Sequence, residues 1–295
     1  MANLLLVGVD GGGTHCRVRI RRLDGTLLGK AEGGSANVFS DVEAALATIV
    51  ATVRAALTSG GEDGDAVERC VVGLGLAGAN VPSVADAIRA RGLPFAASAL
   101  ESDALAACRG AFSGGDGAIG ILGTGSAYAV RVAGERRILG GYGMAVSDHG
   151  SGADLGRRAL AAALLAHDGF GPSSDLSRAL LAEFAGSPHA IAEFARDAAP
   201  RDFGRLAPLI WDHADAGDQV GVALIEESLT HIEASARACL ALGAPAIAFL
   251  GGQAGRYRPR LSPELAARTV DPAGDALDGA LDLAREALAS PRQSS

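Results

Sequence analysis

Residues 8–20, GVDGGGTHCRVRI, constrain the fold of this chain more than any other stretch. An apolar run ends in Asp10, meets three consecutive glycines and Thr14, and continues with alternating apolar and polar residues. Alternation with a period of two predicts a β-strand, and glycines let the backbone turn tightly and approach a bound molecule. The stretch therefore predicts a β-hairpin whose bare turn follows a carboxylate and precedes a hydroxyl.

A second segment repeats this plan later in the chain. LLLVGVDGGGTHCRVRIRRLDGTLLGKAEGG and AIGILGTGSAYAVRVAGERRILGGYG both contain an apolar strand, a Gly/Thr turn, an alternating strand, a short polar turn and a third strand that ends in glycines. Repetition of one supersecondary unit predicts two lobes of similar topology that face each other. We place the lobes at residues 1–112 and 113–295, and we expect the last helix to pack back on the N-terminal lobe.

Strand and helix patterns alternate along the chain. Apolar residues share one helical face in residues 42–57 and again in residues 225–240, which predicts two amphipathic helices. Strands are predicted at residues 4–9, 16–20, 70–76, 118–122, 127–132 and 246–250. This alternation predicts an α/β fold.

Composition excludes several classes of protein. A chain of 295 residues that is 48% hydrophobic can bury a sizeable core, so disorder is excluded. Because 34 acidic residues outnumber 26 basic ones and no run of Lys/Arg is dense, we expect no nucleic-acid partner. The four cysteines, Cys16, Cys70, Cys108 and Cys239, lack metal-ligand spacing and indicate a reducing compartment.

The apolar runs are too short or too interrupted for a membrane partner. No stretch reaches the roughly 18 uninterrupted apolar residues of a membrane helix. The first apolar run lacks a basic segment before it and leads directly into glycines, which is typical of a strand and not of a signal peptide. We therefore expect a soluble cytoplasmic protein.

The two glycine turns are candidate phosphate sites, because the N–H groups of such turns form a concave nest for anions. Each turn also carries a hydroxyl, from Thr14 and Thr124. Two lobes that each present such a turn can hold a triphosphate. Neither turn matches the P-loop pattern, and a strand follows where the dinucleotide fingerprint has a helix. An ordinary hairpin turn is the alternative interpretation of either turn taken alone.

Three aspartates occupy positions that suit a metal site, a general base or a sugar contact. Asp10 ends the first strand and can orient water around a Mg²⁺ ion that bridges phosphates, or can accept turn N–H groups. Asp103 of ESDALAACRGAF opens a short helix and is either its cap or a general base for a sugar hydroxyl that attacks the γ-phosphate. Asp148 lies in a loop before a helix that starts near Ser151, and it either contacts sugar hydroxyls or caps that helix. His149 has no second His or Cys at ligand spacing and is interpreted as a loop histidine.

Together these segments resemble the sugar-kinase branch of the actin-like ATPase superfamily, and within it the N-acetylglucosamine/glucosamine kinases grouped with the BadF/BadG-type ATPases. GVDGGGTHCRVRI is similar to the first phosphate motif of that family, GILGTGS to the second and FLGGQAG, residues 249–255, to the adenosine motif. ESDALAA resembles the catalytic segment and DALDGALDLA the closing helix. The resemblance covers nearly the whole chain and implies two ribonuclease H-like lobes with a nucleotide and sugar cleft between them.

The resemblance implies a role for individual residues. ATP phosphates would be contacted by Gly12, Gly13, Thr14, Thr124 and Gly125, and adenosine by Gly251 and Gly252. Asp10 would serve Mg²⁺, and Asp103 would be the base toward the 6-hydroxyl of the sugar. The sugar would also be contacted by Asn37, Tyr142, Gly143 and Asp148. The resemblance further implies a homodimer.

The substrate prediction depends on departures from the animal N-acetylglucosamine kinases. This chain has YG and DHGSG where they carry Trp-Gly and Asp-Glu-Gly-Ser, while GGSANV, SDHGSGA and PRDFGRLAP are similar to bacterial glucosamine kinases. We therefore predict an ATP-dependent glucosamine 6-kinase, with N-acetylglucosamine as the alternative substrate.

Two other classes of function stay open at this point. A BadF-type conformational ATPase that activates a dehydratase would use cysteines to hold an iron–sulfur cluster across a dimer, yet Cys108 has no second cysteine near it in sequence. A sugar-responsive regulator would need a DNA-binding segment before the first phosphate motif, and we do not expect one because that motif begins at Gly8.

Overall fold

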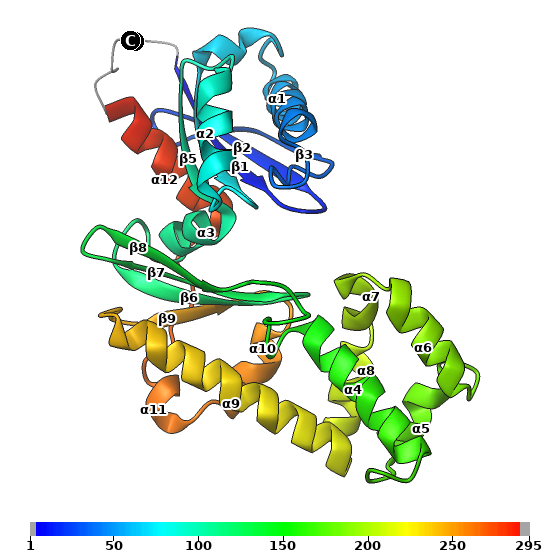
Figure 1. Ribbon diagram of the computed structural model, residues 1–295. Coiled ribbons are helices and arrows are strands. Elements are labelled where there is room, and N and C mark those ends of the chain that lie inside the picture. The colour runs from blue at the N-terminus through cyan, green and yellow to red at the C-terminus, as the bar shows by residue number, and fades with distance from the viewer. Residues whose placement is uncertain (1–3, 290–295) are drawn as a thin grey trace. The chain divides into compact units, whose positions relative to one another are not determined.

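The computed structural model describes residues 4–289 and divides into two compact units (Figure 1). Unit 1 consists of Met1–Gly117, Ala129–Arg137 and Asp271–Ser295, and unit 2 of Ala118–Tyr128 and Ile138–Val270. Compared with the expected boundary at residue 112, unit 1 also takes in a short middle segment and the C-terminal segment. The expected binding of nucleotide and sugar between the two lobes stays a prediction.

Unit 1 contains a five-stranded sheet in the order β3-β2-β1-β4-β5. Its strands are β1 (Leu5–Gly11), β2 (Cys16–Arg22), β3 (Leu27–Gly33), β4 (Cys70–Leu76) and β5 (Ala97–Ser102). β1, β2 and β3 form an antiparallel meander, whereas β4 and β5 run parallel to β1. The predicted hairpin around the first glycine turn is therefore confirmed, and the turn lies at the carboxyl-terminal edge of the parallel strands.

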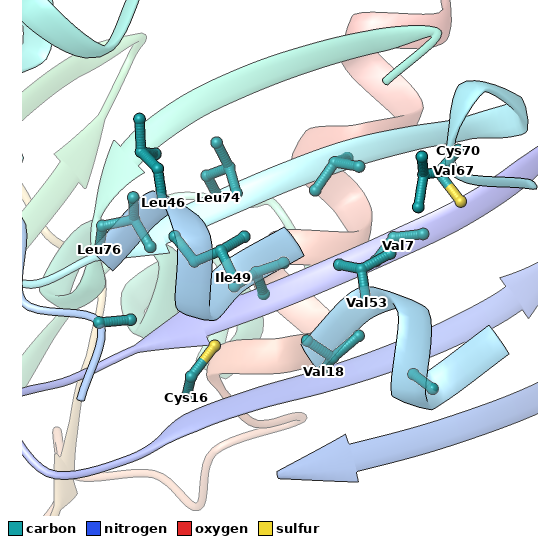
Figure 2. Packing of buried hydrophobic residues seen from close by; sticks show 14 of the residues in the cluster. Val7, Cys16, Val18, Leu46, Ile49, Val53, Val67, Cys70, Leu74 and Leu76 are labelled. Atoms are coloured by element: carbon teal, nitrogen blue, oxygen red, sulfur yellow. The ribbon is translucent and has the colours of Figure 1, made fainter. Parts of the chain in front are cut away.

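Helix α1 (Val42–Ser59) covers one face of this sheet. Its Leu46, Ile49 and Val53 are buried in one cluster with strand residues, and Val53 lies beside Val7 (Figure 2). The 3.6-residue spacing of these side chains produces the apolar stripe that the sequence predicts. α1 is the one helix of residues 4–289 whose length and mean hydropathy of 1.4 would allow a membrane span. Because that stripe packs on the sheet, we interpret α1 as a core helix.

Helices α12 (Ala276–Ala289) and α3 (Asp103–Ala111) pack against the sheet as well. α12 lies on the face opposite α1, where Leu281 meets Leu6 and Val71. The approach is very close, since a Cβ atom added at Gly73 would lie 1.9 Å from the Ala280 carbonyl oxygen. Unit 1 also contains η1 (Ala66–Arg69) and α2 (Pro82–Arg91).

Unit 2 is organised around a second sheet in the order β8-β7-β6-β9. Its strands are β6 (Gly117–Leu122), β7 (Ser126–Val132), β8 (Glu135–Gly140) and β9 (Ile247–Leu250), with β6 and β9 parallel. The predicted strands on either side of the second glycine turn are confirmed. The tip of the β7–β8 ribbon, residues 129–137, belongs to unit 1.

The rest of unit 2 is largely helical. Its helices are α4 (Gly152–His167), α5 (Asp175–Ala182), α6 (Pro188–Asp197), α7 (Pro200–Gly204), α8 (Ala207–Asp215), α9 (Gln219–Ala241), α10 (Ala254–Tyr257), η2 (Arg258–Arg260) and α11 (Pro263–Ala266). Leu155, Trp211, Ile225 and Tyr257 are buried in the core that these helices share. The predicted helix at residues 225–240 is confirmed as the larger part of α9.

Candidate functional site

The first glycine turn joins β1 to β2. The Gly12 N–H donates to the His15 carbonyl at 2.9 Å, and the Gly12 carbonyl accepts from Ala36 N at 3.0 Å. A side chain at Gly13 would meet only the Asn37 amide nitrogen, at 4.0 Å, and one at Gly12 only the His15 carbonyl, at 3.5 Å. Protein crowding therefore does not require glycine at either position, and the free space next to the backbone suits a ligand.

Charged side chains surround this turn. Arg17 Nε donates to Asp10 Oδ2 at 3.0 Å, and Arg17 Nη2 donates to the same oxygen. Asp10, Arg17, Gly12, Thr14, His15 and Glu32 line a cavity of about 340 Å³. The sequence analysis did not single out Arg17. The hairpin register contained the signal, since Asp10 and Arg17 are direct cross-strand partners.

Asp103 is not the cap of its helix. The Ser102 hydroxyl accepts from Leu105 N at 3.2 Å and caps α3. Asp103 is the first helical residue, and its Oδ1 accepts from Ala104 N at 2.8 Å. Burial raises the pKa of Asp103, the Ala104 N–H opposes part of that rise, and the negative charge of Asp10 adds to it. The capping interpretation of Asp103 is therefore wrong.

The parallel strands bring Asp10 and Asp103 to the same edge of the sheet. Asp10 pairs in register with Gly75, and Gly75 pairs with Glu101. Helix α3 packs closely on Gly75, because a Cβ atom there would lie 2.6 Å from Ala106 Cβ and 3.8 Å from Asp103 Cα. Ligands of open α/β sheets bind outside the carboxyl ends of the strands, which is where both acids lie.

Asn37 lies at this edge as well. Its Oδ1 accepts from Phe39 N at 2.9 Å, and the neighbouring Val38 N–H donates to the Ala77 carbonyl just beyond β4. Because the oxygen of the amide is engaged, its Nδ2 end faces Gly13. Unit 1 thus brings together Asp10, the first turn, Asn37 and Asp103.

The second glycine turn joins β6 to β7 in unit 2. The Gly123 N–H donates to the Gly125 carbonyl at 3.0 Å. The first residues of α4 bind this turn, with Gly152 N donating to Gly123 O at 2.8 Å and Ala153 N to Thr124 O at 3.1 Å. Thr124 itself is exposed. Since these two helical N–H groups are engaged, they are not available to an anion.

The third glycine turn follows β9. Gly251 has φ +93°, and a Cβ atom there would lie 2.5 Å from the Leu122 carbonyl oxygen, so the fold itself requires this glycine. A Cβ atom at Gly252 would meet no atom within 4 Å. The Gln253 N–H donates to Leu122 O at 2.9 Å. The third turn is therefore bound to the end of β6, immediately before the second turn.

Asp148 is buried, with 8% of its surface exposed, and has φ +60°. Its Oδ1 accepts from Gly143 N at 3.2 Å, and its Oδ2 lies 2.7 Å from the position of a Cβ atom at Gly125. Burial raises the pKa of Asp148, while the N–H groups of Gly143 and Ser126 oppose the rise. The Ser151 hydroxyl accepts from Asp154 N and caps α4, so the alternative that Asp148 is the cap is wrong. Asp148 instead ties its loop to the second turn.

Two other residues of this loop are Tyr142 and His149. Tyr142, an expected sugar contact, is 77% exposed. The imidazole of His149 stacks on that of His231 with ring centroids 4.4 Å apart. The pairing with an α9 residue was not foreseen, because it joins positions far apart in sequence.

All four cysteines are buried. Burial raises the pKa of Cys16 to about 11 and that of Cys70 to about 12. Cys108, the residue relevant to an iron–sulfur activator, is fully buried, and its Sγ contacts the carbonyl oxygens of Gly117 and Ala129. A cysteine in that position is not presented to a second subunit.

The known proteins that this chain resembles are ATPases and sugar kinases. Residues 7–258 match the BadF/BadG/BcrA/BcrD ATPase family. The chain is 38% identical over 275 residues to the glucosamine kinase GspK of Vibrio cholerae, which covers 93% of this chain and 94% of that protein. It is 34% identical to a Chromobacterium violaceum protein provisionally named N-acetylglucosamine kinase, whose crystal structure matches with a TM-score of 0.88 over 96% of this chain and 100% of that one. A ROK family glucokinase from Streptomyces griseus, 22% identical over 96% of this chain and 99% of that one, shares the fold with a TM-score of 0.54.

Proposed function

Because the chain belongs to the BadF/BadG/BcrA/BcrD ATPase family, we propose that it is a kinase that transfers the γ-phosphate of ATP to the 6-hydroxyl of glucosamine. The observation that carries this proposal is Asp103, a carboxylate of raised pKa that is released from capping and lies beside Asp10 and the first glycine turn. The similarity to a glucosamine kinase over 93% of the chain supports the amino-sugar substrate. N-acetylglucosamine is the alternative substrate.

Asp103 acts as the general base in this proposal. The Ala104 N–H holds Oδ1, and Oδ2 accepts the proton of the sugar hydroxyl as the oxygen attacks the γ-phosphate. A raised pKa makes Asp103 a stronger base than an exposed aspartate, because general-base efficiency increases with basicity as long as the group stays ionised. Most of the remaining rate enhancement comes from alignment and charge neutralisation.

The glycine turns hold the nucleotide. In unit 1, the Gly13 N–H and the Thr14 hydroxyl donate to phosphates, while Gly12, whose N–H is bound to the His15 carbonyl, contacts them by close approach of its backbone. In unit 2, Thr124 and Gly125 contact phosphates. The open space beside Gly12 and Gly13 supports this role. Adenosine binds at the third turn, where Gly251 and Gly252 follow β9, and the open space that a Cβ atom at Gly252 would enter supports the assignment.

The site fits Mg²⁺ as the metal ion. Mg²⁺ usually binds one or two carboxylates and keeps several waters and phosphate oxygens. Asp10 supplies such a carboxylate, and within residues 4–289 no group of three or more His, Cys, Asp or Glu side chains converges that would suit a metal bound by protein alone. When bound, Mg²⁺ neutralises charge on the transferred phosphoryl group. To bind Mg²⁺, Asp10 must break its ion pair with Arg17.

The sugar contacts are Asn37 in unit 1 and Tyr142, Gly143 and Asp148 in unit 2. The Asn37 amide presents its N–H end. Asp148 has a second role in this proposal, since it also accepts from the Gly143 N–H and thereby shapes the loop that carries Tyr142. A homodimer and a cytoplasmic location complete the proposal.

A coupled ADP-release assay tests the function. Purified protein with ATP and Mg²⁺ is given glucosamine, N-acetylglucosamine and a panel of other hexoses, with Asp103→Asn measured in parallel. We expect glucosamine to have the highest kcat/KM. Turnover of another hexose while both amino sugars fail would refute the amino-sugar assignment, and ADP release that no sugar stimulates would favour a conformational ATPase.

A further inference from the structure

One side chain of the third turn is held in a fixed orientation by the only tryptophan of the chain. Trp211 of α8 is 1% exposed, and its indole Nε1 donates to Gln253 Oε1 at 2.6 Å. Trp211 is itself held in place by Tyr257, whose ring meets it edge-on with centroids 4.8 Å apart, and by the Arg260 guanidinium, 5.1 Å from the ring centroid. The Gln253 amide is thus hydrogen-bonded to an indole ring that its own neighbours hold in place.

This hydrogen bond decides which end of the amide is free. An indole N–H can donate but cannot accept, so the Gln253 oxygen must face Trp211 and the NH₂ group must face away. Within residues 4–289, no hydrogen-bond acceptor is assigned to Gln253 Nε2, and the residue is partly exposed. A side-chain amide whose oxygen is held by a hydrogen bond and whose NH₂ group is unused is suited to donate to a ligand.

The free donor lies between the second and third glycine turns. The backbone of Gln253 binds the Leu122 carbonyl, immediately before Gly123. The side-chain Nε2 lies 3.4 Å from the position of a Cβ atom at Gly152, which in turn lies 3.4 Å from the Gly123 carbonyl oxygen. All of these residues belong to unit 2.

We infer that Gln253 is a nucleotide-binding residue whose amide donates to a phosphate oxygen of ATP, and that Trp211 is the positioning residue that fixes the direction of this donor. The inference rests on the proposed ATP site. Phosphate oxygens only accept hydrogen bonds, so an amide locked as a donor matches them, whereas the adenine edge presents donors as well as acceptors. The location beside the second turn favours the phosphates over the base.

Gln253→Glu is the most direct test. Glutamate keeps the size and retains an acceptor for the Trp211 N–H, but it replaces the free donor by a negatively charged acceptor. Binding is measured without sugar, from Trp211 fluorescence and by calorimetry, with ATP, ADP and adenosine. We expect the Kd for ATP and for ADP to rise about tenfold or more, with the affinity for adenosine changed less than about twofold.

Gln219→Glu is the matched control, because it makes the same change at an exposed residue of α9, and it leaves the Kd for ATP unchanged. An ATP affinity of Gln253→Glu within twofold of wild type would overturn the inference. An equal loss for adenosine would overturn the phosphate assignment and place the contact on the base.

Trp211→Phe tests the positioning role, because it keeps an aromatic ring but removes the N–H group. The freed amide can rotate, so we expect KM for ATP to rise several-fold while kcat at saturating ATP and KM for the sugar stay the same. Tyr257→Phe, which keeps the edge-on ring, leaves KM for ATP unchanged. A merely structural role for Trp211 would lower Tm and leave KM for ATP unchanged. If Trp211→Phe does not fold, the Gln253→Glu result still decides the inference.

These measurements separate the inference from the proposed function. Wild-type protein that binds ATP but phosphorylates no amino sugar would refute the proposed function and leave the role of Gln253 testable by binding. Active wild-type enzyme with an unaffected Gln253→Glu variant would refute the inference alone.

Discussion

The two glycine turns follow the same strand plan but have opposite surroundings. The first turn, in unit 1, is bordered by ionisable side chains, with the Asp10–Arg17 pair between β1 and β2 and Asp103 at the same sheet edge. The second turn, in unit 2, is bordered mainly by backbone N–H groups of α4 and by the neutral amide of Gln253. Its nearby carboxylate, Asp148, is occupied with backbone N–H groups.

This difference indicates that the two glycine turns have different roles. Ionisable groups beside the first turn can hold a metal and accept a proton, which are steps of the chemistry itself. Beside the second turn, the neutral Gln253 amide can donate to a nucleotide without changing protonation state, while the α4 N–H groups hold the turn itself. Changes around the first turn should therefore alter kcat and its pH dependence, whereas changes around the second should alter KM for ATP.

The largest effect is expected for Asp103→Asn. Asparagine keeps the size and the acceptor for Ala104 N–H but removes the base, so kcat should fall by about 10²–10⁴ with KM for ATP little changed. Steady-state kinetics measures this. Asp86→Asn, at an exposed side chain of α2, is the control and should keep full activity; full activity in Asp103→Asn would disprove its assigned role.

The third turn offers a pair of substitutions that separates fold from ligand. Gly251→Ala introduces a Cβ atom 2.5 Å from Leu122 O at φ +93°, so it should cost about 1–3 kcal/mol of stability and raise KM for ATP about tenfold. Gly252→Ala has open space, so Tm should stay at the wild-type value while KM for ATP rises. Thermal unfolding and kinetics distinguish the two, and equal Tm losses would contradict the account.

Arg17→Gln should have a smaller effect. It frees Asp10 from its ion pair, and we expect the Mg²⁺ concentration that gives half-maximal activity to fall several-fold. A Mg²⁺ titration at saturating ATP and sugar measures the change. Arg22→Gln, which removes a pair with Glu62, serves as the control; an unchanged Mg²⁺ requirement in Arg17→Gln would argue against Asp10 as the metal-serving residue.

The smallest effect is a shift in pH dependence. Burial and the charge of Asp10 raise the pKa of Asp103 above 3.8, so kcat should fall as pH decreases through that raised value. Asp10→Asn removes the repulsion and should move this acidic limb to lower pH in the residual activity. Ionised Asp103 should also lower stability as pH rises through its folded pKa. Asp103→Asn lacks that penalty and should therefore have a higher Tm than wild type at neutral pH but not below pH 3.8.

Much of the architecture could be predicted from periodicity alone. The alternation in residues 16–20 and the apolar stripe of residues 42–57 specify a strand and a helix, because one face of each must be buried. The first two glycine turns were recognisable because glycines with a Thr or Ser follow an apolar strand in both.

The remaining features depend on contacts between distant residues or on competition between neighbours. Ser102 and Asp103 are both good caps, and only the backbone geometry decides that the serine takes the role. Trp211 and Gln253 are 42 residues apart, so no local pattern joins them. Asp148 adopts φ +60° because its loop turns back on the second glycine turn, which is a tertiary requirement.

The position of the phosphate in the product tests the central claim most directly. ³¹P nuclear magnetic resonance of the reaction with ATP, Mg²⁺ and glucosamine, recorded without proton decoupling, reports how many hydrogens the esterified carbon carries. The account predicts a phosphomonoester triplet, since carbon 6 carries two hydrogens. A doublet, which indicates a ring carbon, or inorganic phosphate without any sugar ester would contradict it.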